Sequence, residues 1–461
     1  MVRSFAAVAF VVCGPVAGFA ATHSVDSIAA LKAKIFSAAP GDTITLKNGA
    51  YATSTAITVR ARGTAAEPIT IAAETVGGVE ISGTNGFSVV EPAEHVIIAG
   101  FTFTHAAGKN TVGAGTAHVR FTRNTFQCAG DGAYLAVAGD DAQIDHNEFR
   151  DKKTVGAMLA VGGTGTQVAR RLWVHHNHFR DFAAVGVNIA EMIRFGLSAQ
   201  AFSNGAGLVE HNLLVRCRGE NEIISSRSSG NTYRYNTLLD SPTSQLTLRA
   251  GNDCAVYGNV FRNTEGLRIY GDRHRVFSNY LEGNYLGIAL GNGDGESEPG
   301  AAPVNHDRPD DCVIAFNTLV DNRTHYQLSR RVTGALGATH TTFANNIILG
   351  TGVAVRIEGP NDGAIWGGNL LWNAGGAGDI PPSGYTKIDP MLVAAPDGIR
   401  RPQPGSPALG AAEGAFPFVA FDLDGQPRPE KKSKGADEIG AEPAVARALT
   451  PADVGPLAAA P

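Results

Sequence analysis

The sequence contains little cysteine, methionine or tryptophan. Its 461 residues include only five cysteines, four methionines and three tryptophans. So few methionines argue against an adaptive, methionine-rich binding surface. The four cysteines beyond residue 20 form no Cys-x-x-Cys pair, which argues against a zinc site. Export would permit disulfides between them, but buried free thiols are the favoured interpretation for Cys128, Cys217, Cys254 and Cys312.

The sequence also lacks a long run of basic or of apolar residues. Thirty-eight Lys and Arg against 43 Asp and Glu give a net charge of −5. Without a basic run, nucleic acid is not the expected partner. After the first twenty residues no stretch approaches the ~18 apolar residues of a membrane-spanning helix, so no membrane partner is expected. An anionic substrate stays possible, because a cleft can be basic on an acidic surface.

The first twenty residues have the pattern of a secretory signal peptide. Arg3 supplies a positive start, residues 5–12 are apolar, and small residues from Gly18 to Ala21 suit cleavage. A retained anchor is the less favoured alternative, because the apolar stretch is too short to span a membrane. We predict a signal peptide over residues 1–20 and export to the periplasm or the medium of a bacterium.

Glycine, by contrast, is abundant, at 56 residues or about 12% against a usual ~7%. A short phrase recurs along the chain, in which a β-rich run is followed by Asn and then, two positions later, by an apolar residue. Its spacing runs from 20 to 38 residues, and the floor of 20 to 24 indicates one structural coil that sometimes carries an insertion. The recurring residues are Asn124, Asn147, Asn177, Asn212, Asn236, Asn259, Asn279, Asn317, Asn346 and Asn369.

The segments around these asparagines are short, alternating and rich in β-branched or aromatic residues, which predicts strands of about 4 to 6 residues. Such strands without intervening helices predict an all-β solenoid, a right-handed parallel β-helix. A propeller would need repeats of ~40 to 50 residues, and no such period is present. We expect each asparagine to adopt the left-handed conformation at a bend, and its amide to hydrogen-bond between coils ~4.8 Å apart.

The two ends of the chain are predicted to differ from the repeats. Residues 27–38 have apolar positions at helical spacing and predict a short helix that caps the first coil. From about residue 381 the chain is rich in Pro and Gly, which predicts loops wrapped around the last coil. Residues 442–461 are rich in Ala and Pro and are predicted to be disordered. Residues 21–441 are therefore expected to form a single β-helix domain.

Three charged clusters in the central coils have spacings compatible with stacking: 188–196, 219–228 and 246–251. Residues two apart on a strand share a face, so Asn188, Glu220 and Glu222 can face one side. Two carboxylates and an amide oxygen are hard ligands that suit Ca²⁺. The alternative is a solvated Glu-x-Glu face with an arginine on the next strand as its salt-bridge partner.

The segment GENEIISSRS, with NIAEMIRFG upstream and LTLRAGND downstream, resembles polysaccharide lyase family 6. That family contains alginate lyases and the dermatan-cleaving chondroitinase B. The resemblance extends to AAPGDTITLKNGAY near the start, GLRIYGDRHRVFSNYLEG in the middle and GADEIGA near the end. It implies a right-handed β-helix that cleaves uronate-containing polysaccharides by β-elimination.

Carried over by position, the resemblance implies calcium ligands at Asn188, Glu220 and Glu222. Arg249 matches an arginine that acts as general acid or charge stabiliser, and Arg194 one that contacts substrate near the metal. Position 227 matches the usual lysine base but holds Arg227. A guanidinium with a pKa above ~12 is a poor base unless it is desolvated beside other cations. Arg227 is therefore either such a base or a ligand for the substrate carboxylate.

A second group of basic residues is predicted to line a substrate groove, on weaker grounds. Three of them lie near coil spacing from Arg249, and three match family residues loosely; a solvated surface is the alternative for all six. They are Arg268, Arg273, His274, Lys153, Arg330 and Arg331. The histidine-rich run at 175–178 is interpreted as strand and turn, because alternation would split neighbouring imidazoles between two faces.

Taken together, the sequence predicts an exported, calcium-assisted alginate lyase acting on polymannuronate or polyguluronate. Three alternatives remain at this point. A chondroitin or dermatan sulfate lyase and a polyuronate C5-epimerase would use the same fold and a similar anionic substrate. A non-catalytic glycan-binding β-helix would explain why an arginine occupies the position of the expected base.

Overall fold

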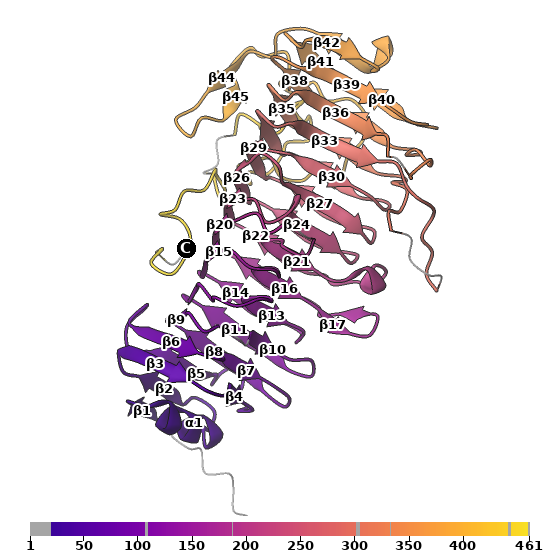
Figure 1. Ribbon diagram of the computed structural model, residues 1–461. Helices are drawn as coiled ribbons and strands as arrows, with labels where there is room; N and C mark the ends of the chain where they lie inside the picture. Colours follow the sequence, from indigo (N-terminus) through magenta and orange to yellow (C-terminus); the bar gives the residue numbers. More distant parts are fainter. Residues whose placement is uncertain are drawn as a thin grey trace, which may run out of the picture.

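The computed structural model describes residues 20–106, 109–186, 188–300, 305–331, 333–440 and 444–459. Within them, three long parallel sheets run along one axis, and the chain visits the sheets in turn on each coil. Figure 1 shows the resulting stack, from the indigo coils beside α1 to the orange coils at the other end. The predicted right-handed parallel β-helix is confirmed.

Sheet A contains the strands that precede the recurring asparagines. Its members in spatial order are β1 (Thr22–Val25), β2 (Thr43–Leu46), β5 (Ile69–Ala73), β8 (Glu94–Ala99), β11 (Ala117–Thr122), β14 (Gln143–Asp145), β19 (Trp173–His175), β22 (Leu208–Glu210), β25 (Thr232–Arg234), β28 (Ala255–Tyr257), β31 (Arg275–Phe277), β34 (Val313–Ala315), β37 (Thr342–Ala344) and β40 (Ile365–Gly367).

Sheet B contains the strands that begin at or just after the asparagines. They are β3 (Gly49–Thr53), β6 (Val79–Gly83), β9 (Phe101–Phe103), β12 (Thr125–Phe126), β15 (Glu148–Lys152), β20 (His178–Phe182), β23 (Leu213–Cys217), β26 (Thr237–Ser241), β29 (Val260–Thr264), β32 (Tyr280–Glu282), β35 (Thr318–Val320), β38 (Ile347–Leu349), β41 (Asn369–Trp372) and β43 (Tyr385–Lys387).

Sheet C carries the charged clusters. It consists of β4 (Ile57–Val59), β7 (Phe87–Val89), β10 (Asn110–Val112), β13 (Leu135–Val137), β16 (Leu159–Val161), β21 (Ile193–Phe195), β24 (Glu222–Arg227), β27 (Gln245–Ala250), β30 (Leu267–Ile269), β33 (Leu286–Gly291), β36 (Thr324–Ser329), β39 (Val353–Ile357) and β42 (Gly376–Gly378). Outside the three sheets lie two short hairpins and three helical turns: β17 (Gly163–Thr164), β18 (Gln167–Val168), β44 (Leu392–Ala394), β45 (Arg400–Pro402), α1 (Ile28–Phe36), η1 (Ser198–Gln200) and η2 (Pro382–Gly384).

The interior is filled by stacked apolar side chains, because alternate residues of each strand point inward. A phenylalanine column on sheet B illustrates this packing: the ring centroids of Phe103 and Phe126 lie 5.0 Å apart, those of Phe126 and Phe149 4.5 Å, and those of Phe149 and Phe179 4.6 Å. All four rings are fully buried. The four cysteines Cys128, Cys217, Cys254 and Cys312 are buried free thiols, as predicted.

The ten recurring asparagines form a continuous buried ladder. In each successive pair, from Asn124 to Asn369, the Nδ2 amide of one asparagine donates to the Oδ1 of the next at 2.9–3.0 Å. The predicted coil-to-coil hydrogen bonding is confirmed. The expected left-handed asparagine is wrong, because the residue before it takes the positive φ, as at His146 (52°), His176 (52°) and Phe316 (58°). The asparagine itself is thereby turned inward.

The predicted capping helix is present as α1 at the indigo end of the stack (Figure 1). The Ser27 hydroxyl accepts a hydrogen bond from the amide of Ala30 at the helix start, and Leu31 and Ile35 are buried against the first coil. Residues 1–19 of the predicted signal peptide lie outside the described residues. Within the described residues, no helix combines the length and apolarity needed to cross a membrane.

The C-terminal segment 444–459 differs from the expected disorder. It runs back along the outer face of sheet B, where Figure 1 shows it in yellow beside β15, β20 and β23. The Leu449 amide donates to Thr237 Oγ1 at 2.9 Å, and Leu449 and Val454 pack against Leu213 and Val215. Sheet B therefore presents an apolar outer patch, which segment 444–459 covers. This packing explains why the segment is ordered, although its Ala- and Pro-rich composition suggested disorder.

We predict that Asn236→Ala lowers the free energy of unfolding by about 3 to 5 kcal/mol, because it leaves several buried partners without hydrogen bonds. The Nδ2 of Asn236 donates to Val209 O and Asn259 Oδ1, and its Oδ1 accepts from the amide of Asn212. Denaturant titration measures the loss. Asn48→Ala is the matched control, since that exposed side chain also accepts a hydrogen bond and water can replace it. Equal losses in the two variants would contradict the role of the ladder.

Candidate active site

Sheet C brings the charged clusters onto neighbouring rungs. The strand register aligns Arg194 of β21 with Ser225 of β24, then with Thr247 of β27 and Arg268 of β30. The pairing of β24 with β27 is irregular after Glu222 and again before Arg227. Such irregularities re-aim side chains at the end of a strand. Arg227 at the end of β24 and Arg249 near the end of β27 both approach Glu222.

Three glutamates form the centre of this site. One carboxylate oxygen from each of Glu191, Glu220 and Glu222 lies within 4.8 Å of the others. Glu191 is fully buried and Glu222 is 3% exposed. Four of their oxygens are buried without a hydrogen-bond partner: both of Glu191, Oε1 of Glu220 and Oε2 of Glu222. Buried carboxylate oxygens without partners are costly, so the cluster needs positive charge.

The electrostatics of Glu220 report the same excess of negative charge. Burial, followed by repulsion from Glu191 and Glu222, raises the pKa of Glu220 to about 8. The other Glu220 oxygen, Oε2, accepts a hydrogen bond from the amide of Ile189 at 3.0 Å, which opposes the shift. Three hard carboxylate ligands with unpartnered oxygens are the donor set that suits Ca²⁺. The residues present therefore fit a calcium ion.

Three arginines surround the glutamates. Arg227 Nη2 lies 3.5 Å from Glu191 Oε1 and 3.6 Å from Glu222 Oε2. Arg268 Nη2 donates to Glu222 Oε1 at 2.7 Å. Arg249 Nε lies 3.8 Å from the same oxygen. Burial lowers the pKa of Arg249, with Glu222 opposing the shift and Arg227 and Arg268 adding to it.

Tyr270, directly after β30, gathers further groups at this end of the site. The guanidinium carbons of Arg249, Arg268 and Arg331 lie 6.0, 5.7 and 5.6 Å from the centre of its ring. The ring of His306 packs on the same tyrosine, with centroids 4.7 Å apart. The predicted groove residues Arg268 and Arg331 thus lie with Arg249.

Asp294 joins Arg331 and His306. Its Oδ1 accepts a hydrogen bond from Arg331 Nη1 at 2.9 Å, and its Oδ2 accepts one from His306 Nδ1 at 2.8 Å. Glu191, Tyr270, Asp294 and His306 were all missed by the sequence reasoning. One signal for Glu191 was available, because it precedes Glu222 by 31 residues, the same offset that pairs Ile193 with Ile224.

The predicted ligand Asn188 lies exposed at the bend before Glu191. Glu191 joins Glu220 and Glu222 as the third carboxylate of the cluster, and the role of Asn188 as a ligand stays a prediction. Arg194 is half-buried on β21 and borders a surface cavity of about 550 Å³. This cavity lies over β10, β13 and β16 and is lined largely by small residues, among them Ala136 and Ala160.

Two predicted groove residues lie elsewhere. His274 is fully buried; its Nδ1 accepts a hydrogen bond from the amide of Cys254 and its Nε2 donates to Tyr270 O. It is a core histidine, because alternation turns it inward beside exposed Arg273. Arg273 forms a two-point ion pair with Asp253 at 2.9 and 3.0 Å, away from the glutamates. The sequence prediction for both residues is corrected accordingly.

Lys153 and Arg330 are exposed side chains. Lys153 follows β15 on sheet B. Its neighbour Lys152 is buried, with Nζ 4.4 Å from the centre of the Tyr134 ring, and burial lowers its pKa to about 8. Arg330 follows β36, and its amide donates to Glu358 Oε2 at 3.3 Å.

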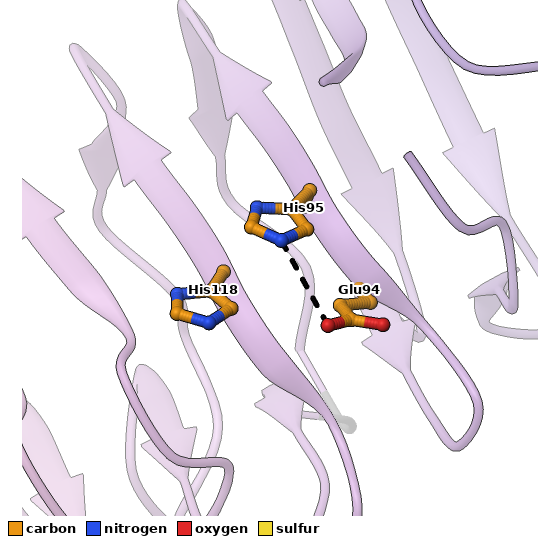
Figure 2. A group of neighbouring side chains, drawn as sticks. All are labelled: Glu94, His95 and His118. Atoms are coloured by element: carbon orange, nitrogen blue, oxygen red, sulfur yellow. Dashed lines mark ion pairs between the residues drawn. The ribbon is translucent and has the colours of Figure 1, made fainter. Parts of the chain in front are cut away.

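A second group of potential ligands lies on sheet A, shown in Figure 2. Glu94 Oε1 lies 3.8 Å from His95 Nε2, and the rings of His95 and His118 stack 4.4 Å apart at an angle of 4°. The lone pair of a ring nitrogen lies in the plane of its ring, so two stacked parallel rings do not both direct a lone pair at an ion between them. Arg62 also pairs with Glu94 at 3.0 Å. The group is a stack of side chains on β8 and β11.

A family model described as chondroitinase B matches residues 25–334, about two thirds of the chain. The chain belongs to this family, polysaccharide lyase family 6. It is therefore a relative of alginate lyases and chondroitinase B, as the sequence resemblance predicted. No match was found among curated proteins.

Solved structures of family members share the fold. The PL6 alginate lyase AlyGC is 24% identical with a TM-score of 0.72; the alignment covers 83% of this chain and 55% of that one, so this chain spans about half of its length. A mannuronic acid specific family 6 lyase from human gut microbiota is 24% identical, with a TM-score of 0.69 and coverage of 80% and 91%. A PL6 alginate lyase in complex with a trisaccharide is 21% identical, with a TM-score of 0.68 and coverage of 83% and 91%.

We predict that His274 makes the stability of this protein depend on pH. Burial lowers the pKa of His274 to about 4, below its ordinary 6.5. The contribution is fully present above pH 6.5 and is lost as the pH falls toward 4, at up to roughly 3 kcal/mol. Denaturant titrations at pH 7 and 4.5 should show a smaller difference for His274→Asn than for the wild type. An unchanged difference would contradict the assignment.

Proposed function

We propose that this polysaccharide lyase cleaves alginate by β-elimination and leaves an unsaturated uronate at the new non-reducing end. The observation that carries the proposal is the set of buried carboxylates Glu191, Glu220 and Glu222 within reach of Arg227, Arg249 and Arg268. The carboxylate of a uronate already carries a negative charge, so its C5 proton is only weakly acidic. A site that removes this proton therefore needs positive charge near the carboxylate. The alginate lyases of similar fold support the substrate class.

Calcium is part of the proposal. Glu191, Glu220 and Glu222 would hold it, and the exposed amide of Asn188 lies at the adjoining bend. When bound, Ca²⁺ neutralises the substrate carboxylate and stabilises the negative charge that develops as the C5 proton leaves. The buried oxygens of Glu191 and Glu222 that lack hydrogen bonds support this assignment, because carboxylate oxygens bind a hard dication such as Ca²⁺.

The arginines orient the substrate and stabilise charge. Arg249 and Arg268, beside Tyr270, are positioned to bind a uronate carboxylate, and Arg194 borders the adjoining cavity. Arg227 lies between Glu191 and Glu222, with Nη2 3.5 and 3.6 Å from their carboxylate oxygens. We infer that Arg227 binds charge and does not accept the C5 proton.

A chondroitin or dermatan sulfate lyase is the second candidate, since the family model that matches is described as chondroitinase B. Both substrates are uronate polymers and both fit an exported protein. We also propose export, which agrees with the signal-like residues 1–20 and with the size of such substrates.

The purified protein is expected to raise ultraviolet absorbance on polymannuronate or polyguluronate, because elimination creates a conjugated double bond. A calcium chelator should reduce the rate, and added Ca²⁺ should restore it. Turnover of dermatan sulfate alone would replace alginate with the second candidate. A rate unaffected by the chelator would contradict the metal site.

Arg249→Ala is expected to lower kcat/KM by about 10²- to 10³-fold, the usual effect of removing one group that stabilises developing charge. Arg273→Ala is the matched control, because that exposed arginine pairs with Asp253 away from the glutamates. Circular dichroism checks that both variants fold. Similar activity in Arg249→Ala and in the control would exclude Arg249 from the chemistry.

A further inference from the structure

β-Elimination needs a group that accepts the C5 proton, and the three arginines nearest the glutamates are all held near carboxylates. We propose that His306 is this general base. The inference rests on the proposed lyase function and assigns a residue in the loop between β33 and β34 to its central step. It explains how the site can operate with an arginine at position 227.

His306 lies at the same end of the site as Arg249. Its ring packs on Tyr270, and the carbonyl oxygen of the preceding Asn305 accepts a hydrogen bond from Arg249 Nη1. Tyr270 is also the point at which Arg268 and Arg331 converge. The imidazole therefore borders the cationic end of the site, where a bound uronate carboxylate would be held.

The loop holds the imidazole in a defined orientation. The Asp294 amide donates to His306 O at 2.7 Å, so backbone and side chain of these two residues are both paired. Because a carboxylate only accepts, the contact between Asp294 Oδ2 and Nδ1 places the ring proton on Nδ1. Arg331 Nη1 and Thr333 Oγ1 in turn hold the other Asp294 oxygen at 2.9 and 3.0 Å. This is the arrangement in which an acid orients a catalytic histidine.

The second ring nitrogen is available. Among the described residues no hydrogen bond to His306 Nε2 is found, and the side chain is 17% exposed. Nε2 therefore carries a lone pair that can accept a proton. The proton acceptor that the sequence resemblance implied, Arg227, is a guanidinium, and the nearby His274 uses both ring nitrogens inside the core.

Burial, more than the surrounding charges, keeps this imidazole neutral. Burial lowers the pKa of His306 to about 4; the hydrogen bond to Asp294 opposes the shift, and Arg249 and Arg331 add to it. The groups that face it are Asp294 from its own loop, Arg249 from β27, Arg331 after β36, and Tyr270 after β30. At neutral pH the free site thus presents an unprotonated base, which an anionic substrate would make more basic.

The step balances in protons and electrons. His306 Nε2 takes the C5 proton, and the electron pair of the C5–H bond passes into the carboxylate as an enolate. That pair then forms the C4–C5 double bond as the C4–O bond breaks. The imidazolium returns the proton to the leaving oxygen, directly or through a water molecule, which restores neutral His306.

Chemical rescue tests the proposal. His306→Ala should lower kcat on alginate by about 10²- to 10⁴-fold, the range for a lost general base, with KM changed by less than about threefold. Added imidazole should restore at least a tenfold gain in the folded variant, because it supplies the missing base. The matched control is His340→Ala, a histidine 68% exposed at a turn of sheet A; it should keep wild-type kcat and show no response to imidazole.

The outcomes separate the two proposals. A wild-type protein without activity on any uronate polymer would overturn the lyase function itself. An active wild type with an equally active His306→Ala would overturn only the base. A folded, inactive variant that imidazole does not rescue would also overturn it, since a merely structural role for His306 predicts that result.

Discussion

The buried asparagine ladder is the constraint on which the rest of the structure depends. Each rung must place its asparagine over the one below for the amide chain from Asn124 to Asn369 to continue. Successive asparagines are 20 to 38 residues apart, so the longest coil has 18 residues more than the shortest. These extra residues must lie in loops outside the coil. The ladder thus keeps the strands of sheet C in register while the loops vary, and it fixes which charged side chains become neighbours.

Charge compensation then determines what the central rungs can do. Three carboxylates from two rungs meet in a buried position. Arg227 approaches them from the rung of Glu222 itself, and the arginines of β27 and β30 approach from the two following rungs. The buried oxygens of Glu191 remain without hydrogen bonds even so. A site with unsatisfied anions beside partly engaged guanidinium groups favours a ligand that brings both a cation and a carboxylate. A calcium-bound uronate has this composition.

The sequence predicted the fold because its signal is repeated ten times, and a wrong spacing at one coil does not hide the period. It also brought Glu220, Glu222, Arg227, Arg249 and Arg268 together correctly, since all lie on or next to strands in register. The rule that successive side chains alternate between the two faces of a strand gave wrong predictions where the chain leaves the strand. Glu191, just before β21, was missed for this reason, and His274 turns inward beside an exposed arginine.

The sequence did not predict the structure of the loop that carries His306 or of the C-terminal segment, because both depend on contacts with distant residues. His306 and Asp294 come from an insertion whose path depends on tertiary contacts with Tyr270 and Arg331, and no local pattern encodes those contacts. The order of residues 444–459 likewise depends on an apolar patch of sheet B more than 200 residues away. In both cases the conformation of the segment is determined by the residues that it packs against and not by its own sequence.

Mass spectrometry of the fragments released from alginate tests the central claim most directly, because it identifies the bond chemistry as well as the turnover. The account predicts oligosaccharides whose new non-reducing ends are one water lighter than those from hydrolysis, formed by the wild type and not by a folded Glu222→Gln variant. Hydrated fragments, or an intact polymer that the protein only binds, would contradict it.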